Sequence, residues 1–438
     1  PGALLRTRYN LLMRFQAALL LLIVCSAALA QSTPKLASQP GPKSVTVPFK
    51  LSHNRVILDV DLRLSDGTTQ RVLAWVDNGN PDLYMSRRLA VGAFSCDGQL
   101  CSATPPMEMN IGGMAIPLDG KTPGTEIKEA WVSPIDKAPI APGLEAEINI
   151  PSSILRHYDV LIDFPEHRFT IALPSNLKFK GVPAKVMVNP QNGLIQVPSQ
   201  IERKKYNLGL DVGRPISFLT GELFDKLSAA HPDWPHLTGA IGPANVSGAA
   251  DEAMRKLMRV ERLQYGPLFL TDVAVADFPS DQLTLFASRA GGPSAGLLGS
   301  EALLNYRVGL DYAHSTVYFD IGRLFDAPDF DVVGLILRPE DDGRFTILGI
   351  ADYDGKPSVP QGDEGVQAGD HLVAVDGIPA RGSTLGQVWA MLAGSPGTKR
   401  TLTIERGGRQ ITVVAEVQHF LDDAPQENRT KKQSKKKN

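Results

Sequence analysis

Cysteine is scarce in this sequence, which has three in 438 residues. The eight histidines are scattered and show no ligand spacing, so we expect no metal centre and no cofactor. The Gly-rich loop of phosphate sites and the Gly-x-Ser-x-Gly turn of serine hydrolases are also missing. These absences exclude the enzyme classes that depend on those motifs.

Net charge is nearly absent as well, at −2. The whole chain therefore gives no electrostatic reason to bind nucleic acid. Hydrophobic residues make up 43% and charged residues 21%, as in a globular protein with a sizeable core. The length suggests two to four domains. The lysine-rich stretch in residues 419–438 predicts a solvated, disordered tail, and a weak contact with an anionic surface is the alternative.

The N-terminal segment has the layout of a secretory signal peptide. Arg14 follows Met13, an apolar stretch runs over residues 17–29, and small residues at Ala28 and Ala30 precede Gln31. We expect a signal peptide at 1–30, with 1–12 as an upstream extension, followed by a Pro-rich linker at 31–44. The expected location is periplasmic or secreted, without a membrane span once the signal is removed; an uncleaved anchor is the alternative.

The cysteines fit an exported protein. Cys25 lies inside the expected signal, which leaves Cys96 and Cys101, only five positions apart. In an oxidising compartment they are a candidate disulfide closing a small loop. Two free thiols are the alternative.

An internal repeat organises the β-rich remainder of the chain. The segment "WVDNGNPDLYMSRRL" aligns with "GLDVGRPISFLTGEL" at a constant offset of 134, so that Asp77 matches Asp211. Other matched pairs are Gly79 and Gly213, Pro81 and Pro215, Tyr84 and Phe218, Ser86 and Thr220, and Leu89 and Leu223. In each copy a strand enters the loop, another leaves it, and Ser86 or Thr220 is placed to cap a helix.

A second repeat follows in the same order, with an offset of 148. "INIPSSILRHYDVLIDFPEHRFTI" aligns with "GLLGSEALLNYRVGLDYAHSTVYF". The matched pairs are Leu155 and Leu303, Tyr158 and Tyr306, Val160 and Val308, Asp163 and Asp311, Phe164 and Tyr312, and Phe169 and Val317. Two ordered repeats indicate duplicated lobes.

These motifs resemble the aspartic proteases of the pepsin/retropepsin type over residues 45–322. The resemblance implies a mainly β fold with lobes at 45–180 and 181–325, whose two Asp-x-Gly loops meet at the floor of a cleft. Two lobes on one chain remove the need for a dimer, so we expect a monomer acting on polypeptide.

The resemblance makes Asp77 and Asp211 the candidate catalytic residues. Two close carboxyl groups share one proton, so one can act as base on a water while the other supports the oxyanion. Gly79 and Gly213 would let the loops turn tightly. Hydrolysis of peptide bonds is the expected activity.

Several positions depart from the family pattern. Asn78 and Val212 stand where a Thr or Ser hydroxyl supports the pair, and only Asn78 can imitate it. Pro151 replaces the glycine found at Gly299, and Arg214 brings a cation that opposes proton sharing. An inactive protease-like protein that binds peptides therefore stays open, as does a structural role for both aspartates in turns.

The segment "MEMNIGGMAIP" predicts a hairpin turning at Gly112-Gly113 and matches "VERLQYGPLFL" in the second lobe. Such a hairpin could serve as a flap over a cleft. Plain sheet is the more common role.

Residues 330–418 resemble a circularly permuted bacterial PDZ domain, a small α+β fold. The resemblance rests on "GVQAGD" followed by "HLVAVDG", a short helix and a strand pair turning at Gly407-Gly408. It implies capture of a protein C-terminus by β-strand addition. The expected carboxylate loop is Gly334, Leu335, Ile336 and Leu337, and the expected groove residues are Leu385, Val388 and Trp389. Packing in the domain core is the alternative for Leu385 and Trp389, and the assignment we favour for Leu392.

Overall fold

The computed structural model describes residues 41–64, 66–90, 94–97, 100–103, 107–118, 129–133, 140–278, 280–322, 330–353 and 356–421. The expected signal peptide, most of the linker and all of the basic tail after residue 421 lie outside these residues; the predicted start of the tail at 419 is too early, because His419 pairs with Asp331 in a strand and Phe420 and Leu421 are buried. The described secondary structure is mainly β, which confirms the predicted fold class. No helix in the described ranges is long and apolar enough to cross a membrane.

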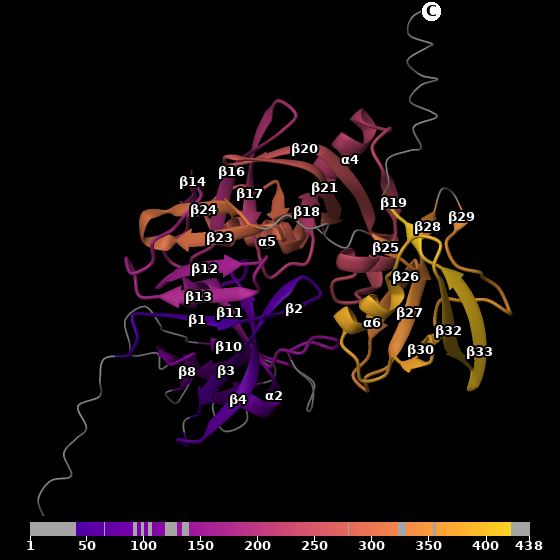
Figure 1. The fold of residues 1–438 in the computed structure, drawn as a ribbon, viewed down its shortest axis with the longest axis horizontal. Coiled ribbons are helices and arrows are strands. Elements are labelled where there is room, and N and C mark those ends of the chain that lie inside the picture. The colour runs from indigo at the N-terminus through magenta and orange to yellow at the C-terminus, as the bar shows by residue number, and fades with distance from the viewer. Residues whose placement is uncertain are drawn as a thin grey trace, which may run out of the picture. The chain divides into compact units, whose positions relative to one another are not determined.

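A six-stranded central sheet joins the two repeats, and its order is β1-β13-β12-β23-β24-β14. Its strands are β1 (Ser44–Pro48), β12 (Asp159–Asp163), β13 (Arg168–Ala172), β14 (Val182–Lys185), β23 (Tyr306–Asp311) and β24 (Thr316–Ile321). Strands β12 and β23 pair antiparallel and lie side by side in Figure 1. The pairing is symmetric about Leu161 and Gly309, which are separated by the repeat offset of 148. Each strand therefore meets its own repeat, as expected for duplicated lobes.

The first lobe is a ten-stranded sheet ordered β6-β7-β10-β5-β11-β4-β3-β8-β9, with β2 paired to β3. Its strands are β2 (Lys50–Ser52), β3 (Arg55–Arg63), β4 (Thr69–Asp77), β5 (Leu83–Met85), β6 (Phe94–Asp97), β7 (Leu100–Ala103), β8 (Glu108–Ile111), β9 (Met114–Pro117), β10 (Glu129–Val132) and β11 (Ile148–Pro151). Two one-turn helices, α2 (Arg87–Ala90) and α3 (Ser152–Leu155), follow β5 and β11.

The second lobe is an eight-stranded sheet ordered β15-β16-β17-β22-β18-β21-β20-β19. Its strands are β15 (Met187–Val188), β16 (Ile195–Ile201), β17 (Lys204–Leu210), β18 (Ser217–Thr220), β19 (His236–Thr238), β20 (Lys256–Tyr265), β21 (Leu268–Phe278) and β22 (Gly296–Leu298). Its helices are α4 (Gly221–Ala230) and α5 (Ser280–Ala290), with 3-10 turns η1 (Gly242–Ala244), η2 (Ala250–Met254), η3 (Ser300–Leu303) and η4 (Tyr312–His314).

The predicted helix caps differ between the repeats. The Thr220 side chain accepts a hydrogen bond from the Leu223 N–H and caps α4 as expected. At α2 the Leu89 and Ala90 N–H groups donate to the Ser86 carbonyl, and the Ser86 hydroxyl donates to Glu147 Oε2 at 3.2 Å. Arg88 pairs with the same carboxylate and holds it beside Ser86.

Residues 330–421 form a C-terminal module around one sheet, ordered β26-β27-β30-β32-β33 with β31 paired to β30. Its strands are β25 (Asp331–Val332), β26 (Leu335–Pro339), β27 (Phe345–Ile350), β28 (Asp352–Tyr353), β29 (Lys356–Pro357), β30 (His371–Val375), β31 (Ile378–Pro379), β32 (Lys399–Arg406), β33 (Arg409–Glu416) and β34 (Gln418–His419), and its helix is α6 (Leu385–Leu392). Thr384 and Gln387 close a capping box at the start of α6.

The hydrophobic core does not stop at the edge of this module. One buried cluster contains Ile241 and Ala244 of the second lobe together with Ile336 and Trp389 of the module. The C-terminal module is therefore packed against the second lobe rather than attached only through the chain.

Candidate active site

Matching strands deliver the two Asp-x-Gly loops. Strand β4 ends at Asp77, and β17 ends one residue before Asp211. In the first lobe β11 pairs parallel with β4 and antiparallel with β5. In the second lobe β22 makes the same two pairings with β17 and β18. Both loops are thus held by a strand that pairs on either side of them, which fixes the carboxylates at equivalent points.

The glycines show how closely the loops approach. A Cβ at Gly79 would lie 2.0 Å from Asp211 Cγ, in the opposite loop. A Cβ at Gly213 would lie 2.5 Å from Asp77 Oδ1 and 3.1 Å from Asp211 Oδ1. These two oxygens are therefore no farther apart than the sum of those two distances. Glycine is required at both positions because each faces a carboxylate of the other lobe.

Asn78 connects the two loops. Its Oδ1 accepts the Val212 N–H at 2.7 Å, and its Nδ2 donates to the Leu210 carbonyl at 3.0 Å. Asn78 is fully buried, so both bonds are shielded from water. The amide spans the lobes as a donor and an acceptor at once. Val212 contributes only its backbone, whose carbonyl accepts the Ser300 hydroxyl at 2.7 Å.

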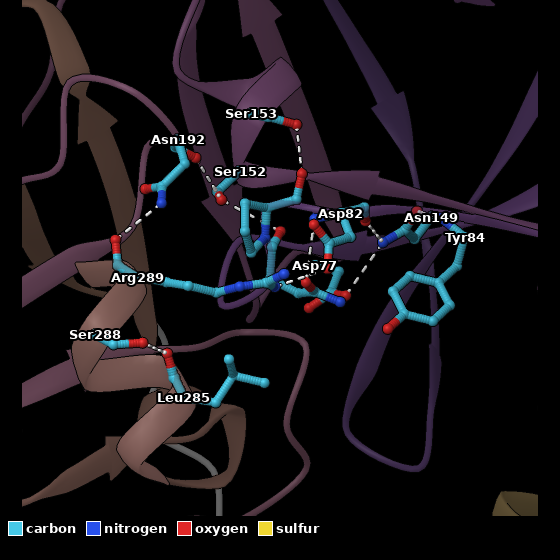
Figure 2. A network of polar contacts seen from close by, with 12 residues as sticks. Asp77, Asp82, Tyr84, Asn149, Ser152, Ser153, Asn192, Leu285, Ser288 and Arg289 are labelled. Atoms are coloured by element: carbon cyan, nitrogen blue, oxygen red, sulfur yellow. Dashed lines mark hydrogen bonds and ion pairs between the residues drawn. The ribbon is translucent and has the colours of Figure 1, made fainter. Parts of the chain in front are cut away.

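Asn149 positions Asp77 from within β11. Its Nδ2 donates to Asp77 Oδ2 at 3.2 Å and to the Asp82 carbonyl at 3.0 Å, while its Oδ1 accepts the Tyr84 N–H at 2.7 Å. Figure 2 shows this amide between Asp77 and Tyr84. The side chain is fully buried, so Asp77 is held by a residue whose other bonds are already fixed.

Asp211 has a more cationic surrounding. Its Oδ1 accepts the Gly213 N–H at 2.9 Å, and its Oδ2 lies 3.6 Å from Arg214 Nε. Arg214 thus stands beside the pair, where the sequence places it.

A second guanidinium, that of Arg55 at the start of β3, acts on the charge of both carboxyl groups. It is only 7% exposed, its Cζ lies 5.7 Å from the Trp75 ring, and its Nη2 donates to the Val246 carbonyl at 2.9 Å. Burial lowers the pKa of Arg55 to about 10, with Arg214 adding to the drop and Asp77 opposing it. Arg55 keeps its positive charge at neutral pH and stabilises negative charge on the pair.

The surroundings of the two carboxyl groups act on their pKa values in different ways. Asp77 and Asp211 are 3% and 2% exposed. Burial raises the pKa of Asp77 to about 8, the Asp211 charge adds to that rise, and the Asn149 hydrogen bond opposes it. Burial also raises the pKa of Asp211, but Arg214 and the N–H groups of Gly213 and Arg214 oppose the rise. The surroundings of Asp77 therefore favour its protonated form, whereas Arg214 and the loop N–H groups favour the ionised form of Asp211.

A polar network beside the pair ties the lobes together (Figure 2). Arg289 of α5 pairs with Asp82 at 2.6 Å, and its carbonyl accepts Asn192 Nδ2 at 2.8 Å. The Ser152 hydroxyl donates to the Asn192 carbonyl at 2.7 Å. Because Asp82 also bonds Asn149, this network connects α5 to the support of Asp77.

The hairpin of β8 and β9 has the predicted turn at Gly112-Gly113, both with positive φ. A Cβ at Gly112 would lie 2.6 Å from Val47 Cγ1 on β1, so the turn packs against the central sheet. This contact gives the hairpin a structural role there.

The two cysteines of the candidate disulfide lie on neighbouring strands. Cys96 and Cys101 are partners in the backbone register of β6 and β7.

The C-terminal residues singled out in the sequence come together around β26 and α6. Leu385, Val388, Trp389 and Leu392 are all buried, with Trp389 at 5% exposed. The Leu335 N–H donates to the Val333 carbonyl, and the Leu337 N–H donates to Asn245 Oδ1 at 3.1 Å. A segment of the second lobe thus already bonds the edge of β26.

The sequence gives no signal for Arg55, Asn149 or Asn245, which approach from segments distant in the chain. Among the residues that the structure describes, no group of three or more His, Cys, Asp or Glu side chains could hold a metal ion.

The comparisons with known proteins give a remote structural likeness and no match in sequence. No family profile and no curated protein matches the sequence. A search of solved structures finds an aspartic proteinase from Irpex lacteus at 11% identity, covering 65% of this chain and 99% of the proteinase, with a TM-score of 0.40. At this level of similarity nothing about individual residues transfers to this chain.

Proposed function

We propose that this protein is an aspartic-type peptidase that hydrolyses peptide bonds with a water activated between Asp77 and Asp211. The observation that carries the proposal is the crossed pair of Asp-x-Gly loops, in which each glycine faces the carboxylate of the other lobe. The arrangement combines two carboxyl groups of unequal proton affinity in a buried site, as acid–base chemistry requires.

The charges assign a role to each carboxyl group. Asp211, ionised beside Arg214, takes a proton from the water molecule. At the same time the water oxygen bonds to the scissile carbonyl carbon. Asp77 gives its proton to the carbonyl oxygen, which forms a tetrahedral diol. Asp211 then returns its proton to the departing amine, Asp77 recovers a proton from a diol hydroxyl, and the C–N bond breaks to release acid and amine.

A second function is supported by the two guanidinium groups. Arg55 and Arg214 both favour ionisation of the pair, and a pair without its proton lacks the acid for the first step. In that case the lobes would bind polypeptide without cleaving it. The two functions make opposite predictions for the pH dependence of stability in the Asp77→Asn variant, which is described in the Discussion.

We further propose that residues 330–421 bind the C-terminal end of a polypeptide, as the PDZ resemblance implies. Strand β26 is the edge of its sheet, and such an edge can accept an added strand. The loop at Gly334 and the apolar face of α6 would flank the added peptide.

We also propose that the chain is exported by its N-terminal segment. N-terminal sequencing of the protein recovered outside the cytoplasm would test this proposal.

The hydrolysis is tested with a pool of unstructured peptides and mass spectrometry between pH 3 and pH 8. Wild type is expected to cleave, whereas Asp77→Asn and Asp211→Asn should each lose at least about 100-fold, the scale of acid–base catalysis. Asp61→Asn, an exposed aspartate on β3, is the matched control and should cleave as wild type does. Binding of the pool without cleavage by wild type would favour the second function.

A further inference from the structure

Strand β26 is the edge of its sheet, and a segment of the second lobe already bonds to this edge. The occupying segment, residues 241–248, is called the docking loop here and lies between β19 and β20 of the second lobe. Its central residue, Asn245, is fully buried and touches both sides of the groove. It bonds Leu337 on β26 and Trp389 on α6.

The Asn245 side chain uses all of its hydrogen-bonding capacity. Oδ1 accepts the Leu337 N–H at 3.1 Å and Trp389 Nε1–H at 3.2 Å. Nδ2 donates to the Leu337 carbonyl at 2.9 Å and to Glu252 Oε2 at 2.6 Å. An asparagine amide has two donors and two acceptor lone pairs, so the fit is complete.

The pair of bonds to Leu337 imitates a paired strand. In an antiparallel ladder, a residue exchanges N–H and C=O bonds with the residue opposite. The Asn245 amide supplies both groups from one side chain. It therefore occupies the Leu337 N–H and C=O groups, with which an added peptide strand would need to pair.

Buried Glu252 holds the docking loop in this shape. Its carboxylate accepts the Asn245 amide, the Ser247 N–H and hydroxyl at 3.0 Å each, and the Gly248 N–H at 3.1 Å. Gly248 has positive φ, and a Cβ there would lie 2.5 Å from Arg338 Cα on β26. The loop is thus shaped to lie flat on the edge strand.

The first lobe closes the far end of the groove. The Gly143 carbonyl accepts the Leu385 N–H at 2.8 Å, and a Cβ at Gly143 would lie 2.8 Å from Pro339 Cγ. A peptide lying along β26 would therefore displace contacts with both lobes.

The docking loop also touches residues beside the aspartate pair. The Asn245 carbonyl accepts His53 Nε2–H at 2.9 Å, and the Val246 carbonyl accepts Arg55 Nη2 at 2.9 Å. Burial lowers the pKa of His53 to about 3, which keeps the ring neutral and able to donate. The His53-Asn54 turn reaches the Asp211 loop as well, because Asn54 Nδ2 donates to the Pro215 carbonyl at 3.2 Å.

We propose that the docking loop is an internal ligand of the β26–α6 groove, which a polypeptide C-terminus must displace, and that its displacement frees Arg55 beside the aspartate pair. This inference rests on the proposed peptide binding by the C-terminal module. Binding in the groove and the state of the pair are then coupled, and the coupling is reciprocal. The internal ligand weakens apparent peptide affinity by the fraction of molecules whose loop is open.

The test uses the full chain and fluorescein-labelled ten-residue peptides that end in Val, Leu or Phe with a free carboxylate. Asn245→Asp keeps the size of the side chain but places an acceptor against Glu252 and the Leu337 carbonyl, so it should expel the loop. We expect it to lower the apparent Kd at least tenfold. Trp389→Phe removes one of the four bonds and should lower it two- to threefold. Asn176→Asp, at an exposed position after β13, is the control and should leave the Kd unchanged.

Hydrogen exchange measures the loop directly. Saturating peptide should speed exchange in residues 241–248 of wild type, and Asn245→Asp should do so without peptide while β32 and β33 stay protected. Equal affinity of wild type and Asn245→Asp, or an unchanged loop on peptide binding, overturns the proposal. An expelled loop with no peptide bound by either protein overturns both this inference and peptide binding by the module.

Peptide cleavage is followed in the same proteins. Released loops should change the cleavage rate of Asn245→Asp relative to Asn176→Asp. Absence of cleavage in wild type and in both variants, together with a tenfold gain in peptide affinity in Asn245→Asp, would refute hydrolysis and leave the displacement of the loop standing.

Discussion

Replacing Asp77 by Asn tests where the proton of the pair resides through its effect on stability. Burial holds the pKa of Asp77 at about 8 in the fold, against an ordinary value of 3.8. Between these values the folded chain keeps a proton that the unfolded chain has lost, so the free energy of unfolding falls as pH rises. One such proton corresponds to about 1.4 kcal/mol per pH unit, or about 3 kcal/mol between pH 5 and pH 7.

Asparagine carries no charge at any of these pH values and has a carbonyl that Asn149 can still donate to. The variant should therefore lose most of that pH dependence and be more stable than wild type at pH 7. Urea unfolding at pH 5, 6 and 7 measures it, with Asp61→Asn expected to keep the slope of wild type. An identical slope in Asp77→Asn and wild type, or a variant less stable at every pH, would refute the assignment of the proton to Asp77.

Three other substitutions probe the supports of the pair. Asn78→Ala removes both bonds between the loops and leaves the buried Val212 N–H without its acceptor. Urea unfolding should therefore show that the free energy of unfolding falls by about 2–4 kcal/mol, and a fall below about 0.5 kcal/mol contradicts the bridging role. Gly213→Ala places a methyl group 2.5 Å from Asp77 Oδ1, so cleavage should fall at least about 100-fold, and full activity would show that the loops lie farther apart. Arg214→Gln removes a cation that lowers the pKa of both carboxyl groups, so the pH profile of kcat/KM should move to higher pH; a shift to lower pH would place Arg214 in another role.

The repeats explain why much of the fold could be predicted. An offset of 134 aligns the Asp-x-Gly loops and an offset of 148 aligns the strands of the central sheet, where Leu161 pairs with Gly309. Repetition along one chain predicts a symmetric contact without knowledge of any side-chain packing. The prediction that Asn78 replaces a hydroxyl follows from the chemistry of one side chain, and its two bonds fit that prediction.

The supports that the sequence does not reveal come from single residues without a local pattern. Arg55 begins an ordinary alternating strand, and nothing in its neighbourhood distinguishes it from an exposed arginine. Asn149 lies between two isoleucines in β11, where burial on both faces of the strand turns its amide toward Asp77. Asn245 acts on a strand 92 positions later, so only the folded chain brings it to Leu337.

The central claim is that the pair holds one proton, on Asp77, with the charge on Asp211. The most direct measurement is a carbon NMR titration of the full chain with labelled aspartate carboxyl groups, in wild type and Asp77→Asn. We predict one resonance that titrates near pH 8 in wild type and is absent in Asp77→Asn. If every aspartate carboxyl group in wild type titrates below pH 5, the pair shares no proton at neutral pH and the account is contradicted.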